Sequence, residues 1–270
     1  MQRRVVAGAE RAQQQPRGAQ VHRAIIAGPA GSFSATRKHW TGRPGRWLNE
    51  VMTRAAYDEI ADWYESDFIR SQSTEDDPLG VHDALRELLG PGTGRCLEIG
   101  CGTGVYAPAV RRLGRTPIGV DLSAGMLRHA AGRLPVARGD ATRLPFADAS
   151  VPAVIAMMVH TDMPGYPAVL REVRRVLAPG GVFVHVGVHP CFCGAFADRS
   201  DPAATVIRPG YRERGFSRDS WTSQGVRDKV GAMHFPLADL LGAFVAAGLT
   251  ADGFAEGGTP TPITFSVRAR

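Results

Sequence analysis

Hydrophobic positions alternate between short apolar runs and amphipathic segments from Thr93 onward. Apolar runs bounded by turn residues are typical of buried strands, and apolar residues spaced three and four apart indicate helices. The pattern predicts strands at 95–100, 116–121, 135–140, 151–159 and 181–189 and helices at 105–114, 123–133 and 166–177. Such alternation favours an α/β fold with a mostly parallel, doubly wound sheet, whose ligand crevice lies at the carboxyl ends of its strands.

The segment 190–231 interrupts this alternation. It mixes arginines and aspartates with five aromatic residues, Phe192, Phe196, Tyr211, Phe216 and Trp221. A connection of this length without clear elements is usually functional or disordered, so we expect a lid or a substrate wall, with ordinary subdomain packing as the alternative. After it the pattern returns, with a helix at 235–249 and two closing strands at 249–257 and 262–270.

Charge is distributed unevenly along the chain. Residues 1–50 hold nine Lys/Arg and two acids, whereas the remainder holds 23 Lys/Arg and 24 acids. The basic, weakly apolar residues 1–51 indicate a disordered leader or an upstream extension, with the working domain at 52–270. A nearly neutral body favours a small-molecule substrate over nucleic acid. At the start of that body, Tyr57, Ile60, Ala61 and Tyr64 share one predicted helix face.

The remaining composition narrows the class of protein. We find no stretch of about 20 apolar residues, so we expect no membrane span. Four cysteines and no secretory signal indicate a cytoplasmic protein. Cys191 and Cys193 lie near His185 and His189, a grouping that suggests either a metal site or apolar packing. Because no second ligand pair has zinc-like spacing, we expect no metal.

Three glycines follow the first predicted strand at every second position, in "EIGCGTGV". Gly100, Gly102 and Gly104 would let the backbone approach a ligand closely. A dinucleotide site requires G-x-G-x-x-G, but here the third glycine comes one position early. Asp121 ends the next strand, where a carboxylate can accept hydrogen bonds from both hydroxyls of a ribose, and Asp140 ends the third.

Together, "LEIGCGTG", "IGVDLSAGML", "GDATRLPFADAS" and "LREVRRVLAPGG" resemble the successive motifs of class I S-adenosylmethionine-dependent methyltransferases of the small-molecule type. The resemblance implies a Rossmann-like, seven-stranded sheet that ends in an antiparallel hairpin. It also implies that S-adenosyl-L-methionine is the cofactor and that a helix at the start of the domain covers the pocket. The implied cofactor-binding residues are Tyr57, Tyr64, Glu98, Gly100, Gly102, Gly104, Asp121, Leu122, Met126, Asp140 and Ala141.

The implied reaction is an in-line methyl transfer to an oxygen, nitrogen or carbon of a small acceptor. Much of its catalysis can come from positioning, and a base is needed only for an acceptor that retains a proton. The candidate proton acceptors are His160, His189 and His234, with Asp162 a weaker one. The alternatives are a catalytically idle cofactor-binding partner protein and, less favoured, a nicotinamide-dependent oxidoreductase. The oligomeric state is not readable from the pattern.

Overall fold

The computed structural model describes residues 56–70, 77–201, 203–219 and 225–270. The predictions for the leader at 1–51 and for Trp221 therefore lie outside the described residues. All of the elements below belong to one compact unit of the chain.

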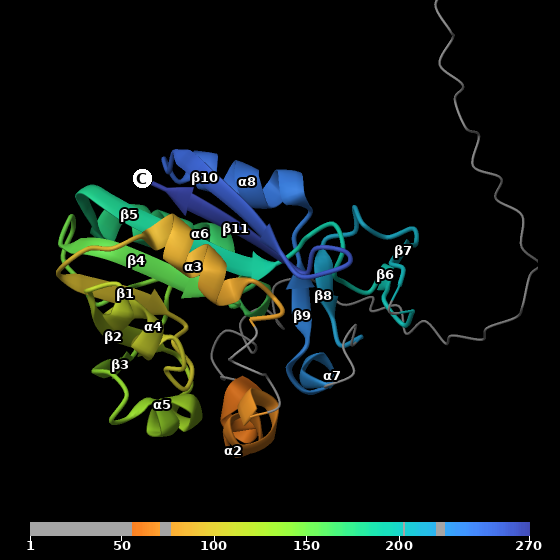
Figure 1. The fold of residues 1–270 in the computed structure, drawn as a ribbon, viewed down its shortest axis with the longest axis horizontal. Coiled ribbons are helices and arrows are strands. Elements are labelled where there is room, and N and C mark those ends of the chain that lie inside the picture. Colours follow the sequence, from red (N-terminus) through yellow and green to blue (C-terminus); the bar gives the residue numbers. More distant parts are fainter. Residues whose placement is uncertain (1–55, 71–76, 202, 220–224) are drawn as a thin grey trace, which may run out of the picture. The chain divides into compact units, whose positions relative to one another are not determined.

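Seven strands form the central sheet in the order β10-β11-β5-β4-β1-β2-β3 (Figure 1). The strands are β1 (Arg95–Ile99), β2 (Thr116–Asp121), β3 (Val136–Arg138), β4 (Val151–Met157), β5 (Leu177–Val188), β10 (Ala251–Gly257) and β11 (Thr264–Ala269). β1 to β5 pair in parallel, whereas β11 pairs antiparallel with β5 and with β10. The predicted fold class, including the closing hairpin, is confirmed.

Helices cover both faces of this sheet. One core contains α6 (Tyr166–Val176) and α8 (Leu237–Ala246), packed on β1, β4, β5 and β11. The other contains α3 (Val81–Leu89) and α4 (Ala107–Arg112) against the opposite faces of β1, β4 and β5. Figure 1 shows α3 in front of the sheet and α6 behind it. Burial of apolar side chains on both faces explains why the strands read as nearly continuous apolar runs.

Two elements differ from the predicted pattern. α3 was not predicted, although its buried residues Val81, Ala84, Leu85, Leu88 and Leu89 recur at helical spacing. β5 begins at Leu177, whereas we predicted a start at residue 181. The early start is accommodated by a register shift against β4 between Val151 and Ala153, so the Pro-Gly-Gly segment continues the strand instead of separating it from α6.

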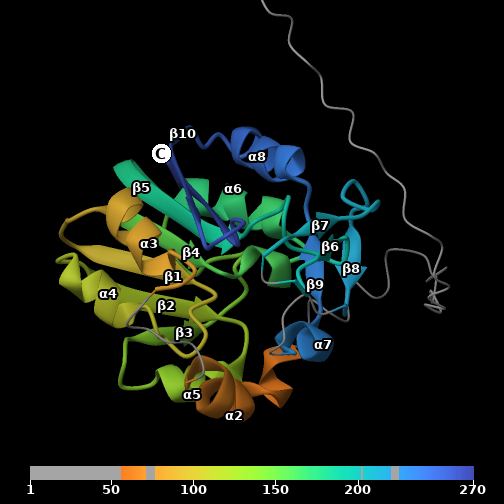
Figure 2. The same cartoon turned by 45° about the vertical axis from the view of Figure 1, so that its right-hand side comes forward.

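The remaining elements lie around the carboxyl ends of the parallel strands. They are η1 (Ala56–Glu59), α2 (Ala61–Trp63), η2 (Tyr64–Ile69), α5 (Ala124–Ala130), η3 (His160–Asp162) and α7 (Val226–Val230), with the small pairs β6 (Ala197–Asp198)–β7 (Val206–Ile207) and β8 (Gly215–Ser217)–β9 (Ala232–His234). Ser123 caps α5, because its side chain accepts a hydrogen bond from Met126 N at 3.0 Å. In Figure 2, α2 lies between α5 and α7.

Candidate functional site

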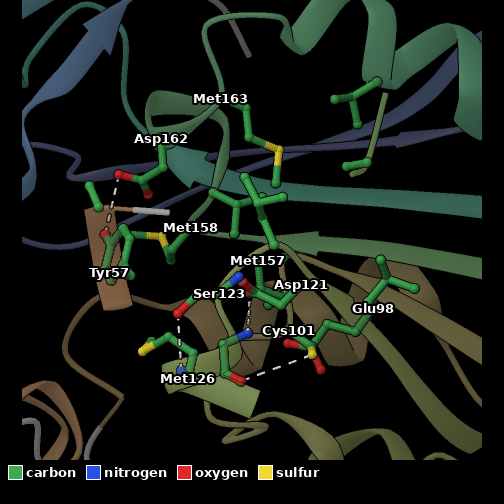
Figure 3. Close-up of a pocket in the computed structure, with 18 of the residues that line it drawn as sticks. Tyr57, Glu98, Cys101, Asp121, Ser123, Met126, Met157, Met158, Asp162 and Met163 are labelled. Atoms are coloured by element: carbon green, nitrogen blue, oxygen red, sulfur yellow. Dashed lines mark hydrogen bonds between the residues drawn. The ribbon is translucent and has the colours of Figure 1, made fainter. Parts of the chain in front are cut away.

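A pocket opens at the carboxyl ends of β1, β2 and β4. β1 lies between β2 and β4 in the sheet. The strand order reverses at this point, because β2 and β3 follow on one side of β1 and β4 and β5 follow on the other. Such a switch point leaves a crevice between the diverging connections. Residues of η1, η2, η3, β8 and α7 complete the walls. Figure 3 shows this cavity and the side chains that border it.

The glycine turn after β1 forms the floor of the pocket. Gly100 and Gly102 line it and have φ of +64° and +51°, a region that favours glycine. A Cβ at Gly100 would come within 2.8 Å of Val159 Cγ1 and 2.9 Å of Met163 Cε. Gly104 does not line the pocket, and a Cβ there would meet Leu134 Cδ2 at 2.5 Å. Gly104 therefore serves the packing of the turn against the segment after α5.

Asp121 ends β2 and points its carboxylate at the glycine turn. Oδ2 accepts a hydrogen bond from Gly102 N and Oδ1 accepts one from Ser123 N, both at 2.8 Å (Figure 3). These two backbone donors hold the carboxylate in one orientation, and each oxygen keeps a further lone pair for a ligand. Burial raises the pKa of Asp121, while the two backbone hydrogen bonds oppose the shift.

Glu98 lies at the other side of the turn, on β1. Its side chain is 1% exposed, yet Oε2 has no hydrogen-bond partner in the described structure. Burial, and then the charge of Asp121, raise the pKa of Glu98 to about 8. An unpartnered buried carboxylate oxygen in a pocket costs free energy unless a ligand donor or cation meets it.

The third side of the pocket holds four more of the implied cofactor-binding residues. Leu122, Met126, Asp140 and Ala141 all line the pocket, so the structure brings these residues together. Asp140 also caps a turn, because its Oδ1 accepts a hydrogen bond from Thr142 N at 2.8 Å. Asp140 thus both lines the pocket and fixes the local backbone.

The segment 56–70 closes the pocket as a cover. Tyr57 and Tyr64 line it and pack edge to face, with ring centroids 5.6 Å apart. Two acidic residues connect the cover to the rest of the domain. Asp58 Oδ1 accepts hydrogen bonds from Ser123 Oγ at 2.6 Å and Gly125 N at 2.8 Å. Glu65 pairs with Arg133, which also donates to Thr103 O at 2.8 Å. The cover is thus tied to both α5 and the glycine turn.

None of the three candidate histidines is among the described residues that line the pocket. His160 is buried behind the wall, and burial lowers its pKa well below the usual value. His189 bonds Glu256 Oε1 at 2.7 Å and accepts from Cys191 N, and His234 bonds Tyr211 O at 2.7 Å. All three rings contact other protein groups in the structure, so the role of these histidines as proton acceptors stays a prediction.

The sequence did not indicate Met157, Met158, Met163 and Val230, which line the pocket. Met157 ends β4, Met158 and Met163 follow it, and Val230 comes from α7. The sequence signal for the methionines lies in "AMMVHTDMPG", which is also typical of the end of a buried strand. Phe216 of β8, one of the five aromatic residues of the segment 190–231, lines the pocket as well.

Asp162, the weakest sequence candidate, is the acid that faces the pocket beside these residues. Tyr57 OH donates to its Oδ1 at 3.2 Å, and Arg227 of α7 forms an ion pair with the same oxygen. Burial raises the pKa of Asp162, although Arg227 opposes the shift. Lys229 Nζ lies 4.7 Å from the ring centroid of Trp63, so α7 also contacts the cover.

Comparison with known proteins identifies the domain. The family model described as "Methyltransferase domain" matches residues 97–185. Demethylmenaquinone methyltransferase of Mycolicibacterium paratuberculosis is 41% identical over 103 residues, covering 37% of this chain and 45% of that protein. Residues 97–185 match a methyltransferase domain, and the fold is that of S-adenosylmethionine-dependent methyltransferases.

Two further matches agree with this assignment. A probable phthiotriol/phenolphthiotriol dimycocerosates methyltransferase 2 of Mycobacterium ulcerans is 35% identical over 128 residues, covering 44% of this chain and 49% of that protein. The crystal structure of an S-adenosylmethionine-dependent methyltransferase from Mesorhizobium loti shares the fold, with a TM-score of 0.58 and 24% identity over 70% of this chain and 96% of that one. The chain spans about half the length of the curated relatives it matches.

The pocket of the methyltransferase domain fits S-adenosylmethionine, the cofactor that its family implies. The unpartnered, buried Oε2 of Glu98 suits a cationic ligand, and the fixed carboxylate of Asp121 suits a ribose. In the described part of the chain, we find no group of three or more His, Cys, Asp or Glu placed to hold a metal ion. No helix among the described residues is long and apolar enough to cross a membrane.

Proposed function

We propose that this protein transfers the methyl group of S-adenosylmethionine to a small-molecule acceptor. The observation that carries the proposal is the pairing, in one pocket, of the fixed Asp121 carboxylate with the buried, unpartnered Glu98 oxygen. When bound, the cofactor supplies a methyl group already activated on a sulfonium. What the chain must provide is therefore position, exclusion of water and, for a protonated acceptor, a proton acceptor.

The family resemblance implies cofactor roles for individual residues, and the positions of these residues around the pocket support those roles. Asp121 would bind the ribose hydroxyls, and Leu122 and Met126 would pack against adenine. Asp140 and Ala141 would meet the adenine edge, while Glu98 would attract the positively charged methionine part. Tyr57 and Tyr64 in the cover would exclude water from the site. Gly100 and Gly102 would let the backbone approach the ligand, and Gly104 would support the turn from behind.

The acceptor side is the wall made by η3, β8 and α7. Its apolar members support an apolar acceptor, and the names of the mycobacterial relatives point to demethylmenaquinone and to phthiotriol-type lipids as acceptors of those proteins. Within residues 52–270, the segment 190–231 would act as the substrate wall, since Phe216 and Val230 belong to it. All four cysteines are free thiols, which supports a reducing, cytoplasmic location.

Calorimetric titration tests the cofactor half of the proposal. S-adenosylmethionine and S-adenosylhomocysteine should bind the wild type, NADH and NADPH should not, and Asp121→Ala should bind the sulfur cofactors weakly. A preference for a nicotinamide would overturn the proposal. Binding without turnover of any demethylquinone or phenol offered would instead favour the idle partner protein.

A further inference from the structure

Asp162 is held at the acceptor side of the pocket by groups from two other parts of the chain. Tyr57 of the cover and Arg227 of α7 both donate to Oδ1. Among the contacts of the described residues, none engages Oδ2, so that oxygen is the one available to a ligand. Figure 3 shows Asp162 and Tyr57 at one end of the cavity and Glu98 at the opposite end. The carboxylate is thus separated from the side predicted for the cofactor's methionine part.

The ion pair sets the charge of this end of the pocket. The side chain of Arg227 is 8% exposed and that of Asp162 is 17% exposed. A carboxylate so far removed from water is kept only when a partner compensates its charge, and Arg227 does so. The pair has no net charge, so this end of the pocket favours neither a cationic nor an anionic acceptor. A neutral acceptor suits it best.

The surroundings of Asp162 are apolar. Met158, Met163, Phe216 and Val230 line the same pocket as Asp162. Thioethers and an aromatic ring make an adaptable, polarizable surface that packs well on flat ring systems. A single carboxylate oxygen in such a wall recognises a single donor. These features describe a neutral ring compound that carries one hydroxyl.

Building on the proposed function, we propose that Asp162 Oδ2 binds the ring hydroxyl of a neutral, apolar acceptor and removes its proton during methyl transfer. The O–H bond breaks and the proton goes to Oδ2, while the oxygen forms a bond to the methyl carbon. The S–C bond breaks, and its electron pair stays on sulfur. Arg227 and Tyr57 are positioning residues, because they hold the carboxylate through Oδ1.

A phenolic hydroxyl matches this base better than an aliphatic alcohol. Its ordinary pKa is about 10, like that of tyrosine, and proton transfer is most effective when the base is not too weak for the acid. Burial raises the pKa of Asp162, which makes its carboxylate a stronger base. Burial by the cover and α7 therefore serves both recognition and proton removal.

A matched pair of probes tests binding directly. 1-Naphthol and 1-methoxynaphthalene differ only in the hydroxyl proton and one methyl group. They are titrated by calorimetry into the complex with S-adenosylhomocysteine. We expect the wild type to bind 1-naphthol at least tenfold more tightly, and Asp162→Asn to lose that preference while its affinity for S-adenosylhomocysteine changes less than threefold.

The control is Asp252→Asn, an acid that pairs with Arg268 and Arg270 away from the pocket. This variant should keep the wild-type preference. An equal preference in Asp162→Asn and wild type, or no preference in the wild type, would overturn the proposal. Failure of the wild type to bind S-adenosylhomocysteine at all would instead contradict the proposed function, so the two failures are distinguishable.

Turnover with 1-naphthol gives a second readout. Asp162→Asn should lower kcat for its O-methylation by about 10²-fold or more, with the KM for S-adenosylmethionine unchanged. Arg227→Lys keeps a cation beside Asp162 and should retain more kcat than Arg227→Met. A kcat for Asp162→Asn within threefold of the wild type would refute the assignment of Asp162 as the proton acceptor.

Discussion

The proposed cofactor side of the pocket is built from residues close together in the sequence, whereas the proposed acceptor side is assembled from distant segments. Glu98, Gly102 and Asp121 lie on two adjacent strands and the turn between them. Tyr57, Asp162 and Arg227 come from the cover, η3 and α7. The cofactor side depends on backbone conformation, which few substitutions preserve. The acceptor side depends on side chains that belong to long connections.

The two sides also differ in how they treat a buried acid. Glu98 keeps an unpartnered oxygen, and its raised pKa keeps it protonated near neutral pH until a cationic ligand favours the charged form. Asp162 is neutralised within the protein by Arg227. We infer that the cofactor side is built to attract a positive group, and that the acceptor side is built to remain neutral. The following predictions probe this contrast, beginning with the largest expected effect.

Removal of the Arg227 charge should have the largest effect on stability. Arg227→Met leaves Asp162 buried without its partner, so the free energy of unfolding should fall by about 3–5 kcal/mol. Urea denaturation measures this loss. The double variant Arg227→Met/Asp162→Asn removes both charges and should recover most of the stability. Equal stability of the single and double variants would show that the pair is not electrostatically coupled.

On the cofactor side, Asp121→Ala should weaken binding of S-adenosylhomocysteine by about 30- to 1000-fold. The variant loses the carboxylate that accepts ligand hydroxyls, and hydrogen bonds to a charged group contribute about 1.5–3 kcal/mol each. Calorimetry measures the change. Asp252→Asn serves again as the control and should bind normally. A loss below threefold in Asp121→Ala would remove Asp121 from the cofactor site.

The raised pKa of Glu98 predicts that the stability of the ligand-free protein depends on pH. Burial raises its pKa from 4.5 to about 8, so the folded state keeps a proton that the unfolded state has released. Stability should therefore fall as pH rises from about 4.5 to about 8, by at most about 1.4 kcal/mol per pH unit. Denaturation of wild type and Glu98→Gln across this range isolates the effect. Parallel curves for the two proteins would contradict the assignment.

Two glycines of the turn should separate stability from binding. Gly104→Ala forces a side chain toward Leu134 at φ +76° and should cost about 1–3 kcal/mol in stability, with cofactor affinity within threefold of wild type. Gly102→Ala lies in the pocket and should weaken cofactor binding. Thermal unfolding and calorimetry on the two variants measure both quantities. A large loss of cofactor affinity in Gly104→Ala at retained stability would place Gly104 in the site.

The smallest effect is expected at the histidines outside the pocket. His189→Gln and His234→Gln can keep a hydrogen bond to Glu256 and to Tyr211 O, and should change kcat by less than threefold. Steady-state kinetics on the acceptor that is turned over measures this. A tenfold loss of kcat in either variant, at wild-type stability, would show that this histidine takes part in the reaction.

Sequence reasoning succeeded where the chemistry is local. Apolar runs predicted the strands, and glycines at every second position predicted the turn. Asp121 lies at a strand end in the pocket, and its role toward the cofactor stays a prediction. Sequence reasoning succeeded less well at His160, whose position after β4 was right but whose ring packs beside Tyr166 and His185. The direction of a side chain at a strand end depends on the layer packed against it, which no local pattern encodes.

The sequence by itself determined the class of fold and the edge of the sheet where the pocket lies, through the periodicity of its apolar residues and a turn whose residues are adjacent in the chain. The cofactor came from the resemblance of the motifs to those of class I methyltransferases. Only the tertiary structure decided that Asp162, and not a histidine, faces the acceptor side. That outcome depends on Tyr57 and Arg227, which lie 105 and 65 residues from Asp162 and meet it because the cover and α7 fold onto the same strand ends.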